Sequence, residues 1–446
     1  MTSHSITTRQ TAITAVAAGV CAAAIAGTGL GAAPTANATC ISLFGIGNGG
    51  GCTSNTFSVA LAIGDGATAT ANGLFGAALV LGNGAIAETG DAFTFATAVG
   101  DVSTATAMGL FGIATQLGAN GTATTQGSGS FANLGLNIAL NVAIASAGDT
   151  VTAAGIGNLA ANLFGRASAP GTHTVSSLGT LDIALNVAGN DNTVTSGAGL
   201  FNRSLSFFGT GNTVAGDGGV SNVARNFFGD GNQVTTVGGD LNSASNFVGS
   251  GNTVTVVAGA GNIATSLLGD ANEVSVAGGT LDGARNWFGR QNVVTTVGGL
   301  QNSVTNIGGD GNVLTSSGSN GNGAFNLLGS GNALEAGSLG SNGNQATTVG
   351  GSGNTVTAGA PGNNTGGFAV FGSNNTVTAG PGPFALAGSV FQNGQSVTKV
   401  GPGIAINDFR IGGAAAERTG SGSPAASRAS SASAGKPASA VRGSSR

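Results

Sequence analysis

The residues with the clearest potential for chemistry are three aspartates at every fortieth position, Asp230, Asp270 and Asp310. Each lies in a Gly-Asp-Gly or Gly-Asp-Ala turn that is followed by asparagine. Enzymes that cleave polysaccharides use paired carboxylates, and stacking two coils apart would separate these aspartates by about 9–10 Å, near the upper limit for an inverting pair. The intervening positions hold Ser250 and Arg290, so the preference of aspartate for turns explains the column better than catalysis does.

Histidine and cysteine offer little further chemistry. His173 is the only histidine after residue 38, so a Ser-His-Asp triad could form only through it. Its place after the loop at residues 167–170 predicts a solvated side chain. Two thiols without a nearby histidine make an incomplete zinc site. We therefore assign no catalytic, cofactor-binding or metal-ligating residue and expect a protein that is not an enzyme.

The segment 1–38 has the features of a secretion signal. Residues 11–33 form an apolar, alanine-rich run, and the small-residue site Ala36-Asn37-Ala38 follows it. Cleavage after Ala38 would leave Thr39 as the first residue of a secreted or cell-surface protein, and the alternative is a retained N-terminal membrane helix. No later segment has 18 unbroken apolar residues, so we expect no membrane span in the mature chain.

The cysteines agree with export. Cys21 would leave with the signal, whereas Cys40 and Cys52 remain as an even pair. Such a pair in an exported protein predicts a disulfide. The bond would close a small loop at the start of the first coil, where a stack of coils needs a cap.

A repeat with a period of 18 begins after this loop. Phenylalanine recurs at positions 57, 75, 93 and 111, and alanine at positions 69, 87, 105 and 123. Alternation of alanine and threonine around Ala69 predicts a strand with alanine on the inner face and threonine on the outer face.

A longer repeat follows, in which asparagine occupies every tenth position from 192 to 342 except Asp282. Two unlike tens alternate, so the period is 20, which is typical of a chain wound into a solenoid. Two apolar columns are predicted to face inward, namely Phe207, Phe227, Phe247, Leu267, Trp287, Ile307 and Leu327, and Val194, Val214, Val234, Val254, Val274, Val294, Leu314 and Leu334.

The asparagine array itself is predicted to be structural. Stacked amides can hydrogen-bond from coil to coil, and asparagine tolerates the left-handed conformation of tight turns. A second asparagine-rich column at 186, 226, 246, 286, 306 and 326 is interrupted by Ser206 and Ser266. A ligand-binding array is the alternative. The predicted ladder consists of Asn202, Asn212, Asn222, Asn232, Asn242, Asn252, Asn262, Asn272, Asn292, Asn302 and Asn312.

These patterns predict an all-β fold, a parallel β-solenoid with 18-residue and then 20-residue coils. We expect a signal peptide at 1–38, a disulfide-bonded cap at 39–55, the 18-residue repeat at 56–135 and the 20-residue repeat at 136–380. A C-terminal cap is expected at 381–413, and a disordered, mildly basic tail rich in serine, alanine and glycine at 414–446. The repeat is predicted to open into a surface loop at residues 167–170 and to slip by two positions after Asn342.

Part of the chain resembles known surface proteins. Segments 62–73 (AIGDGATATANG) and 79–85 (LVLGNGA) resemble head repeats of trimeric autotransporter adhesins, over residues 56–126. The whole chain is similar to the Gly- and Asn-rich repeat proteins exported by mycobacteria and related actinobacteria, although no Pro-Glu motif occurs near its start. These resemblances imply a parallel β-roll on a bacterial surface.

The features together favour a non-enzymatic structural or adhesive role at the cell surface or outside the cell. The partner is unknown; cell-envelope polymers, touched by the basic tail, and a host surface are the candidates. The net charge of −4 and the lack of a basic stripe argue against nucleic acid. One alternative is ice binding through outward threonine columns, and another is a polysaccharide-active solenoid enzyme. The best threonine column holds Thr195, Thr235, Thr255, Thr295 and Thr315.

Overall fold

The computed structural model describes residues 39–127, 136–145, 148–359 and 361–412, which form two compact units that meet in sequence at His173 and Thr174. Within these residues all regular structure is strand, and the strands form a parallel β-solenoid of about 17 turns, as predicted. No described helix is long and apolar enough to cross a membrane. The predicted signal at 1–38, including Ala38, and the predicted tail at 414–446 lie outside the described residues.

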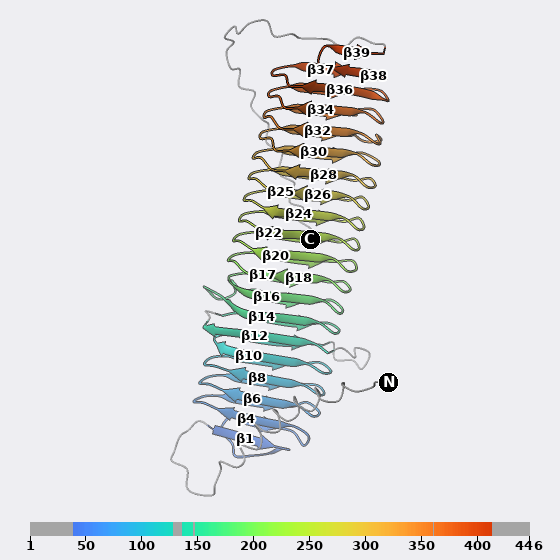
Figure 1. The fold of residues 1–446 in the computed structure, drawn as a ribbon. Coiled ribbons are helices and arrows are strands. Elements are labelled where there is room, and N and C mark those ends of the chain that lie inside the picture. Colours follow the sequence, from blue (N-terminus) through green and yellow to red (C-terminus); the bar gives the residue numbers. More distant parts are fainter. Residues whose placement is uncertain (1–38, 128–135, 146–147, 360, 413–446) are drawn as a thin grey trace, which may run out of the picture. The chain divides into compact units, whose positions relative to one another are not determined.

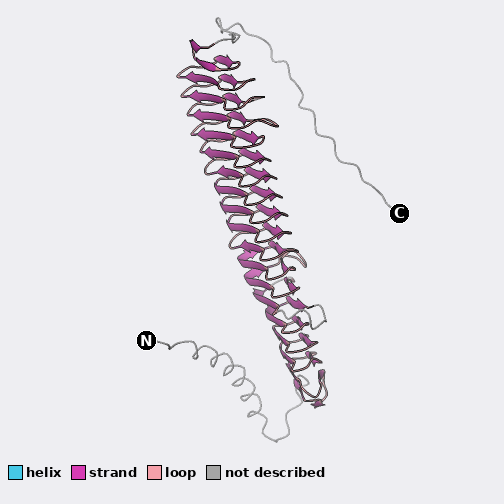
Figure 2. Ribbon diagram, turned by 90° about the vertical axis from the view of Figure 1, so that its right-hand side faces the viewer, coloured by secondary structure: helices cyan, strands magenta, loops and turns pink. Residues whose placement is uncertain are grey.

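Each coil contributes one strand to each of two sheets, and most strands pair in parallel with the equivalent strand of the next coil (Figures 1 and 2). We call the sheet that contains the even-numbered strands sheet A and the one that contains most odd-numbered strands sheet B. The strands of the first unit are β1 (Thr39–Leu43), β2 (Ile46–Gly47), β3 (Cys52–Ser54), β4 (Val59–Ile63), β5 (Thr68–Ala71), β6 (Ala77–Leu81), β7 (Ile86–Thr89), β8 (Phe95–Val99), β9 (Thr104–Ala107), β10 (Ile113–Ala119), β11 (Thr122–Gln126), β12 (Ile138–Ala145), β13 (Thr150–Ala154) and β14 (Leu159–Arg166).

The second unit continues the same alternation of sheets. Its strands are β15 (Thr174–Ser177), β16 (Ile183–Asn190), β17 (Thr193–Ser196), β18 (Arg203–Ser206), β19 (Thr213–Asp217), β20 (Val223–Phe228), β21 (Gln233–Val237), β22 (Ser243–Val248), β23 (Thr253–Val257), β24 (Ile263–Leu268), β25 (Glu273–Ala277), β26 (Gly283–Asn286), β27 (Val293–Val297), β28 (Ser303–Ile307), β29 (Val313–Ser317), β30 (Gly323–Leu327), β31 (Ala333–Ala336), β32 (Gln345–Val349), β33 (Thr355–Ala358), β34 (Gly366–Val370), β35 (Thr376–Ala379), β36 (Ala385–Val390), β37 (Ser396–Lys399), β38 (Gly403–Ile406) and β39 (Phe409–Ile411).

The core of the first unit is thin because small residues line it. Ala69 in β5, Ala87 in β7, Ala105 in β9 and Ala123 in β11 are fully buried. The residues on either side of them, which are threonines except around Ala87, are partly or fully exposed. The predicted alternation is therefore confirmed. The phenylalanines of the 18-residue repeat lie outside, where the rings of residues 75, 93 and 111 stack with centroids 5.3 and 5.1 Å apart.

The core of the second unit confirms one predicted inward column and contradicts the other. The valine and leucine column from Val194 to Leu334 is buried in sheet B. The column from Phe207 to Leu327 faces outward instead, and Trp287 within it is 43% exposed. Side chains alternate along a strand, and the buried Asn226 takes the inward position next to Phe227. Alanines such as Ala224 complete the interior of sheet A.

The register of the second unit follows the sequence closely. Ser303 of β28 pairs with Gly323 of β30, one regular repeat later in the sequence. Gly323 then pairs with Gln345 of β32, so the coil between them is longer by two positions, as predicted. The extra positions come before Asn342, which already pairs with Asn320, so the predicted place of the slip after Asn342 is wrong. The coils continue beyond residue 381, because β36 pairs in parallel with β34 and β37 with β35. The range 381–413, expected to be a cap, thus begins with further solenoid, and the terminal hairpin of β38 and β39 follows.

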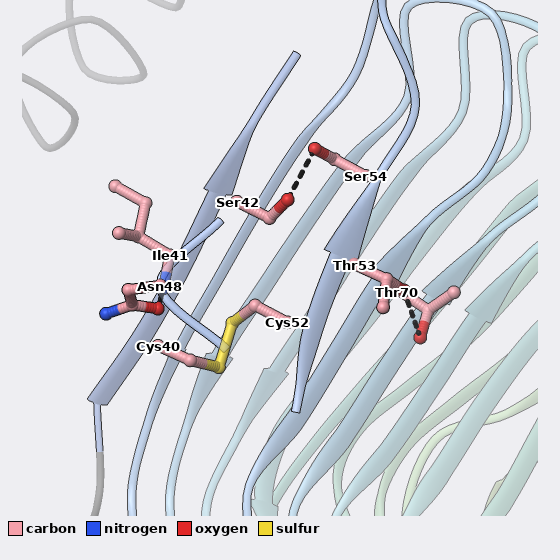
Figure 3. The surroundings of a disulfide bond; sticks show 8 residues. All are labelled: Cys40, Ile41, Ser42, Asn48, Cys52, Thr53, Ser54 and Thr70. Atoms are coloured by element: carbon pink, nitrogen blue, oxygen red, sulfur yellow. Dashed lines mark hydrogen bonds between the residues drawn. A yellow bond between two sulfur atoms is a disulfide. The ribbon is translucent and has the colours of Figure 1, made fainter. Parts of the chain in front are cut away.

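Both ends of the strand array depart from parallel pairing. At the start, β1 runs antiparallel to β4 and to β2, and the predicted disulfide joins Cys40 in β1 to Cys52 in β3, with Cα atoms 5.5 Å apart (Figure 3). At the other end, β39 runs antiparallel to β38, and Lys399 points into the interior with only 3% of its surface exposed. Short or antiparallel edges and inward charges hinder the addition of further strands.

Candidate functional site

The most regular polar feature of the molecule is a set of asparagines that clamp each coil to the next. Asn252 shows the arrangement: its Oδ1 accepts a hydrogen bond from the backbone N–H of Asn272 at 2.9 Å, and its Nδ2 donates to the carbonyl of Gly269 at 2.8 Å. The backbone N–H of Asn252 in turn donates to Oδ1 of Asn232 in the preceding coil. The side-chain amide thus acts like one more peptide group, and it carries the hydrogen-bond ladder through the turn between the sheets.

The same backbone-to-Oδ1 bond recurs through the predicted ladder at 2.8–3.0 Å. It also runs past the slip in register, from Asn344 to Asn322 and from Asn354 to Asn332. The ladder asparagines are buried, with at most 1% of their surface exposed. These columns are therefore part of the frame and do not form an exposed binding array.

The second asparagine column forms a direct amide-to-amide ladder inside sheet A. Nδ2 of Asn246 donates to Oδ1 of Asn226 at 2.8 Å, and the same bond joins Asn326 to Asn306 at 2.7 Å. Ser206 and Ser266 interrupt it. Among the described residues, the Ser206 hydroxyl and the Asn226 Nδ2 are both buried without a hydrogen-bond partner, because the serine is too short to bridge the gap.

A related buried polar line crosses the interior of the first unit. Nδ2 of Asn141 donates to Oε1 of Gln116 at 2.7 Å, Nδ2 of Asn162 donates to Oδ1 of Asn141 at 2.8 Å, and Nε2 of His173 lies 3.1 Å from Oδ1 of Asn162. His173 is fully buried, so the expectation of a solvated loop histidine is wrong. The loop itself is exposed at residues 168–171, as predicted, but the chain turns inward at its end.

Asp282, the exception in the ladder, places a carboxylate where the other ladder positions hold an amide. Its Oδ1 accepts the backbone N–H of Asn302 at 2.7 Å, whereas its Oδ2 is buried with no hydrogen-bond partner among the described residues. That oxygen replaces the nitrogen that Asn262 and Asn302 use to donate to glycine carbonyls. Burial raises the pKa of the Asp282 carboxyl from its ordinary 3.8 to about 6, against the opposing effect of the Asn302 hydrogen bond.

The three candidate catalytic carboxylates lie in exposed turns and are bound by the backbone of the preceding coil. Asp230 accepts the N–H of Thr210 at 2.6 Å, Asp270 that of Ser250 at 2.8 Å, and Asp310 that of Arg290 at 2.7 Å. The hydroxyls of Ser250 and Ser330, which occupy the same position in other coils, accept the backbone N–H groups of Asp230 and Asp310 in the same way. Each aspartate of this column therefore caps the turn of the preceding coil. No two of these carboxylates are held together across a cleft.

Metal-binding groups are not assembled either. Within the described ranges, no three side chains of His, Cys, Asp or Glu lie close enough to share an ion. The only ion pair found there joins Arg290 and Asp270 at 3.7 Å, and both side chains are at least half exposed. Such a pair contributes little to stability.

The outer faces of the two sheets differ in chemistry, which the sequence reasoning missed. Sheet B of the second unit presents hydroxyls, with Thr235, Thr255, Ser275, Thr295 and Thr315 in one register and each partly exposed. Sheet A presents aromatic and aliphatic side chains together with arginines. The rings of residues 207, 227 and 247 stack with centroids 5.0 Å apart. The sequence does contain the information needed to place these side chains, because successive residues of a strand point to opposite faces. Counted in steps of two from each buried ladder asparagine, these residues fall on the outer face.

Comparison with known proteins gives no family for this chain. No protein-family model, no curated protein and no solved structure matches it.

Proposed function

We propose that this chain is an exported, non-enzymatic β-solenoid with a structural or adhesive role at the cell surface or outside the cell. The observation that carries the proposal is the use of the repeated polar side chains. The ladder asparagines, the inner amide column and the turn aspartates are all bound to neighbouring coils. What the fold offers to its surroundings is therefore its two long outer faces.

The disulfide between Cys40 and Cys52 supports the export part of the proposal. Disulfides of this kind persist in oxidising compartments and are rare in the cytosol. Thr39, which follows the expected cleavage site, is the first residue of β1, so cleavage there would leave the folded part intact.

Cell fractionation combined with mass spectrometry of the purified protein tests this proposal. We expect an envelope or culture-medium fraction, an N-terminus at Thr39 and a mass lower by two hydrogens than that of the reduced chain. A full-length cytosolic protein with free thiols would contradict it. Deleting residues 414–446 tests whether the tail contributes to retention on envelope polymers.

Ice binding is a second candidate, favoured by the in-register hydroxyl column of sheet B. Rows of threonine at the strand spacing of about 4.8 Å can order water. The neighbouring column is less regular, since it holds Gln233, Glu273 and Val293. Thermal hysteresis and inhibition of ice recrystallisation would support this function, and their absence in the purified protein would exclude it. Turnover on a panel of glycans would instead revive the carboxylate-enzyme hypothesis.

A further inference from the structure

The outer face of sheet A in the second unit combines large apolar groups with positive charge. From β18 to β30 its strands lie side by side (Figure 1), and every coil adds two or three outward side chains. Most are apolar, and Trp287 is the only tryptophan in the chain. The outward apolar residues and arginines of this face are Arg203, Leu205, Phe207, Val223, Arg225, Phe227, Phe247, Ile263, Leu267, Arg285, Trp287, Ile307, Phe325 and Leu327.

The edge of this face adds a further apolar column. One position of each coil holds an exposed apolar side chain, except where Gly308 interrupts the column, and each of these side chains is between 38% and 69% exposed: Phe208, Phe228, Val248, Leu268, Phe288 and Leu328. The rings of Phe208 and Phe228 stack with centroids 5.2 Å apart, so they present ring edges to the outside. An exposed apolar surface of this length marks an interaction site in a soluble protein.

Charge is segregated around this face. No aspartate or glutamate occurs in any sheet A strand of the second unit, although the chain as a whole is net negative. The carboxylates lie in turns, as Asp230 and Asp270 do, on the outer face of sheet B, as Glu273 does, or in the interior, as Asp282 does. Within the described residues Arg203, Arg225 and Arg285 have no carboxylate within ion-pair distance.

The geometry points to an anionic lipid surface as the occupant of this face, with the apolar side chains in the headgroup boundary and the three arginines on phosphate groups. Aromatic side chains favour the membrane interface, and arginine stems can extend to anionic headgroups. A second copy of this chain fits less well, because packing two such faces together would bury arginine against arginine with no carboxylate nearby. This inference extends the proposed adhesive role, yet binding to vesicles does not require export, so the two can fail separately.

Trp287 provides a direct probe, because it lies on the face itself. The full chain is titrated with vesicles of phosphatidylcholine alone and of phosphatidylcholine with about one-third phosphatidylglycerol, at low ionic strength. We expect the tryptophan emission to shift to shorter wavelength only with the anionic vesicles, and the shift to reverse in high salt. If the chain bound only through its N-terminal segment or its tail, the protein would co-sediment with the vesicles, but the emission wavelength of Trp287 would not change.

Charge-removing variants measure the contribution of the face. Each of Arg203→Gln, Arg225→Gln and Arg285→Gln should weaken partitioning by about fivefold, and the triple variant by roughly 100-fold. Arg290→Gln is the matched control, because Arg290 lies in a turn, and it should change partitioning less than twofold. Circular dichroism checks that every variant keeps its strands.

Three results would overturn the proposal. One is an unchanged Trp287 emission with anionic vesicles, and another is an equal loss of binding in Arg290→Gln and in the triple variant. The third is concentration-dependent dimerisation, measured by sedimentation equilibrium, that is lost on replacing Phe247 by serine while vesicles fail to bind. That last result would assign the face to a second copy of the chain.

Discussion

Replacing Asp282 by asparagine should stabilise the second unit at neutral pH. The buried Oδ2 of Asp282 has no hydrogen-bond partner among the described residues, whereas an Nδ2 at the same position could donate to a glycine carbonyl as its neighbours in the column do. The variant removes a buried charge and restores a repeated hydrogen bond with almost no change in shape.

The magnitude follows from the pKa of Asp282. A rise from 3.8 in the unfolded chain to about 6 in the folded chain corresponds to about 3 kcal/mol, at 1.36 kcal/mol per pKa unit. The folded state holds the proton more tightly, so the stabilisation is complete below about pH 4, falls as the pH rises toward 6 and is absent above that. Asp282→Asn should therefore gain about 3 kcal/mol at pH 7 and much less at pH 4.

Chemical denaturation at pH 4 and pH 7 measures the difference in free energy of unfolding between Asp282→Asn and the natural chain. Native-state hydrogen exchange over β24–β28 adds a local measurement, because long repeat arrays do not always unfold in one step. Asp182 occupies the same position in an earlier coil, and burial raises its pKa to about 6 as well. Some dependence of stability on pH should thus remain in Asp282→Asn and become smaller when Asp182→Asn is added.

Asn242→Asp is the reverse control, because Nδ2 of Asn242 donates to the carbonyl of Gly238 at 3.0 Å. It should be destabilised at pH 7 by a similar amount and recover toward pH 4. Two results would contradict this reasoning: Asp282→Asn that is no more stable than the natural chain at pH 7, or Asn242→Asp that is equally stable there. In either case the Nδ2 hydrogen bonds of the ladder would not contribute to stability.

Three further perturbations follow from the same architecture. Ser206→Asn should close the gap between Asn186 and Asn226 in the inner amide ladder and raise the free energy of unfolding by about 1 kcal/mol, measured by denaturant titration. A loss of that size would show that the gap has no room for an amide. Replacing Cys40 and Cys52 by serine should destabilise the N-terminal cap by about 3 kcal/mol, seen as faster hydrogen exchange in β1–β5 with little change in the second unit; equal exchange in both proteins would contradict this. Gly249→Ala should lower the melting temperature far more than Gly251→Ala. A Cβ at position 249 would lie 1.9 Å from a backbone oxygen of the next coil, whereas a Cβ at position 251 would meet open space. Similar melting temperatures for the two variants would refute the close approach of the coils.

The periodic parts of the fold could be predicted from the sequence because each coil repeats the environment of the last. The spacing of asparagine and valine predicts the coil length, the sheet B core from Val194 to Leu334 and a slip of two positions near Asn342. Hydrophobicity alone predicts burial of the column from Phe207 to Leu327, and that prediction is wrong because the column lies on the outer face. The neighbouring buried position in sheet A holds asparagine instead, and the side-chain amides of these asparagines hydrogen-bond to one another.

The irregular parts carried no such signal. Gln116, Asn141, Asn162 and His173 form a continuous buried line, but their sequence separations of 25, 21 and 11 share no period. The hydrogen-bond partners of the individual ladder asparagines could not be predicted from the sequence either. Whether an asparagine pairs with another amide or with a backbone N–H depends on the path of the turn, which spacing alone does not define.

The clamp between successive coils also has an evolutionary consequence. The hydrogen bonds that a ladder asparagine makes outside its own coil reach the coil that follows and the coil that precedes it. The 20-residue coils between β18 and β30 therefore present similar partners to both neighbours. Removal or duplication of one whole coil would re-form every one of these contacts. The gene can therefore lengthen or shorten the protein by unequal recombination in whole-coil steps, which changes the extent of its outer faces while preserving their chemistry.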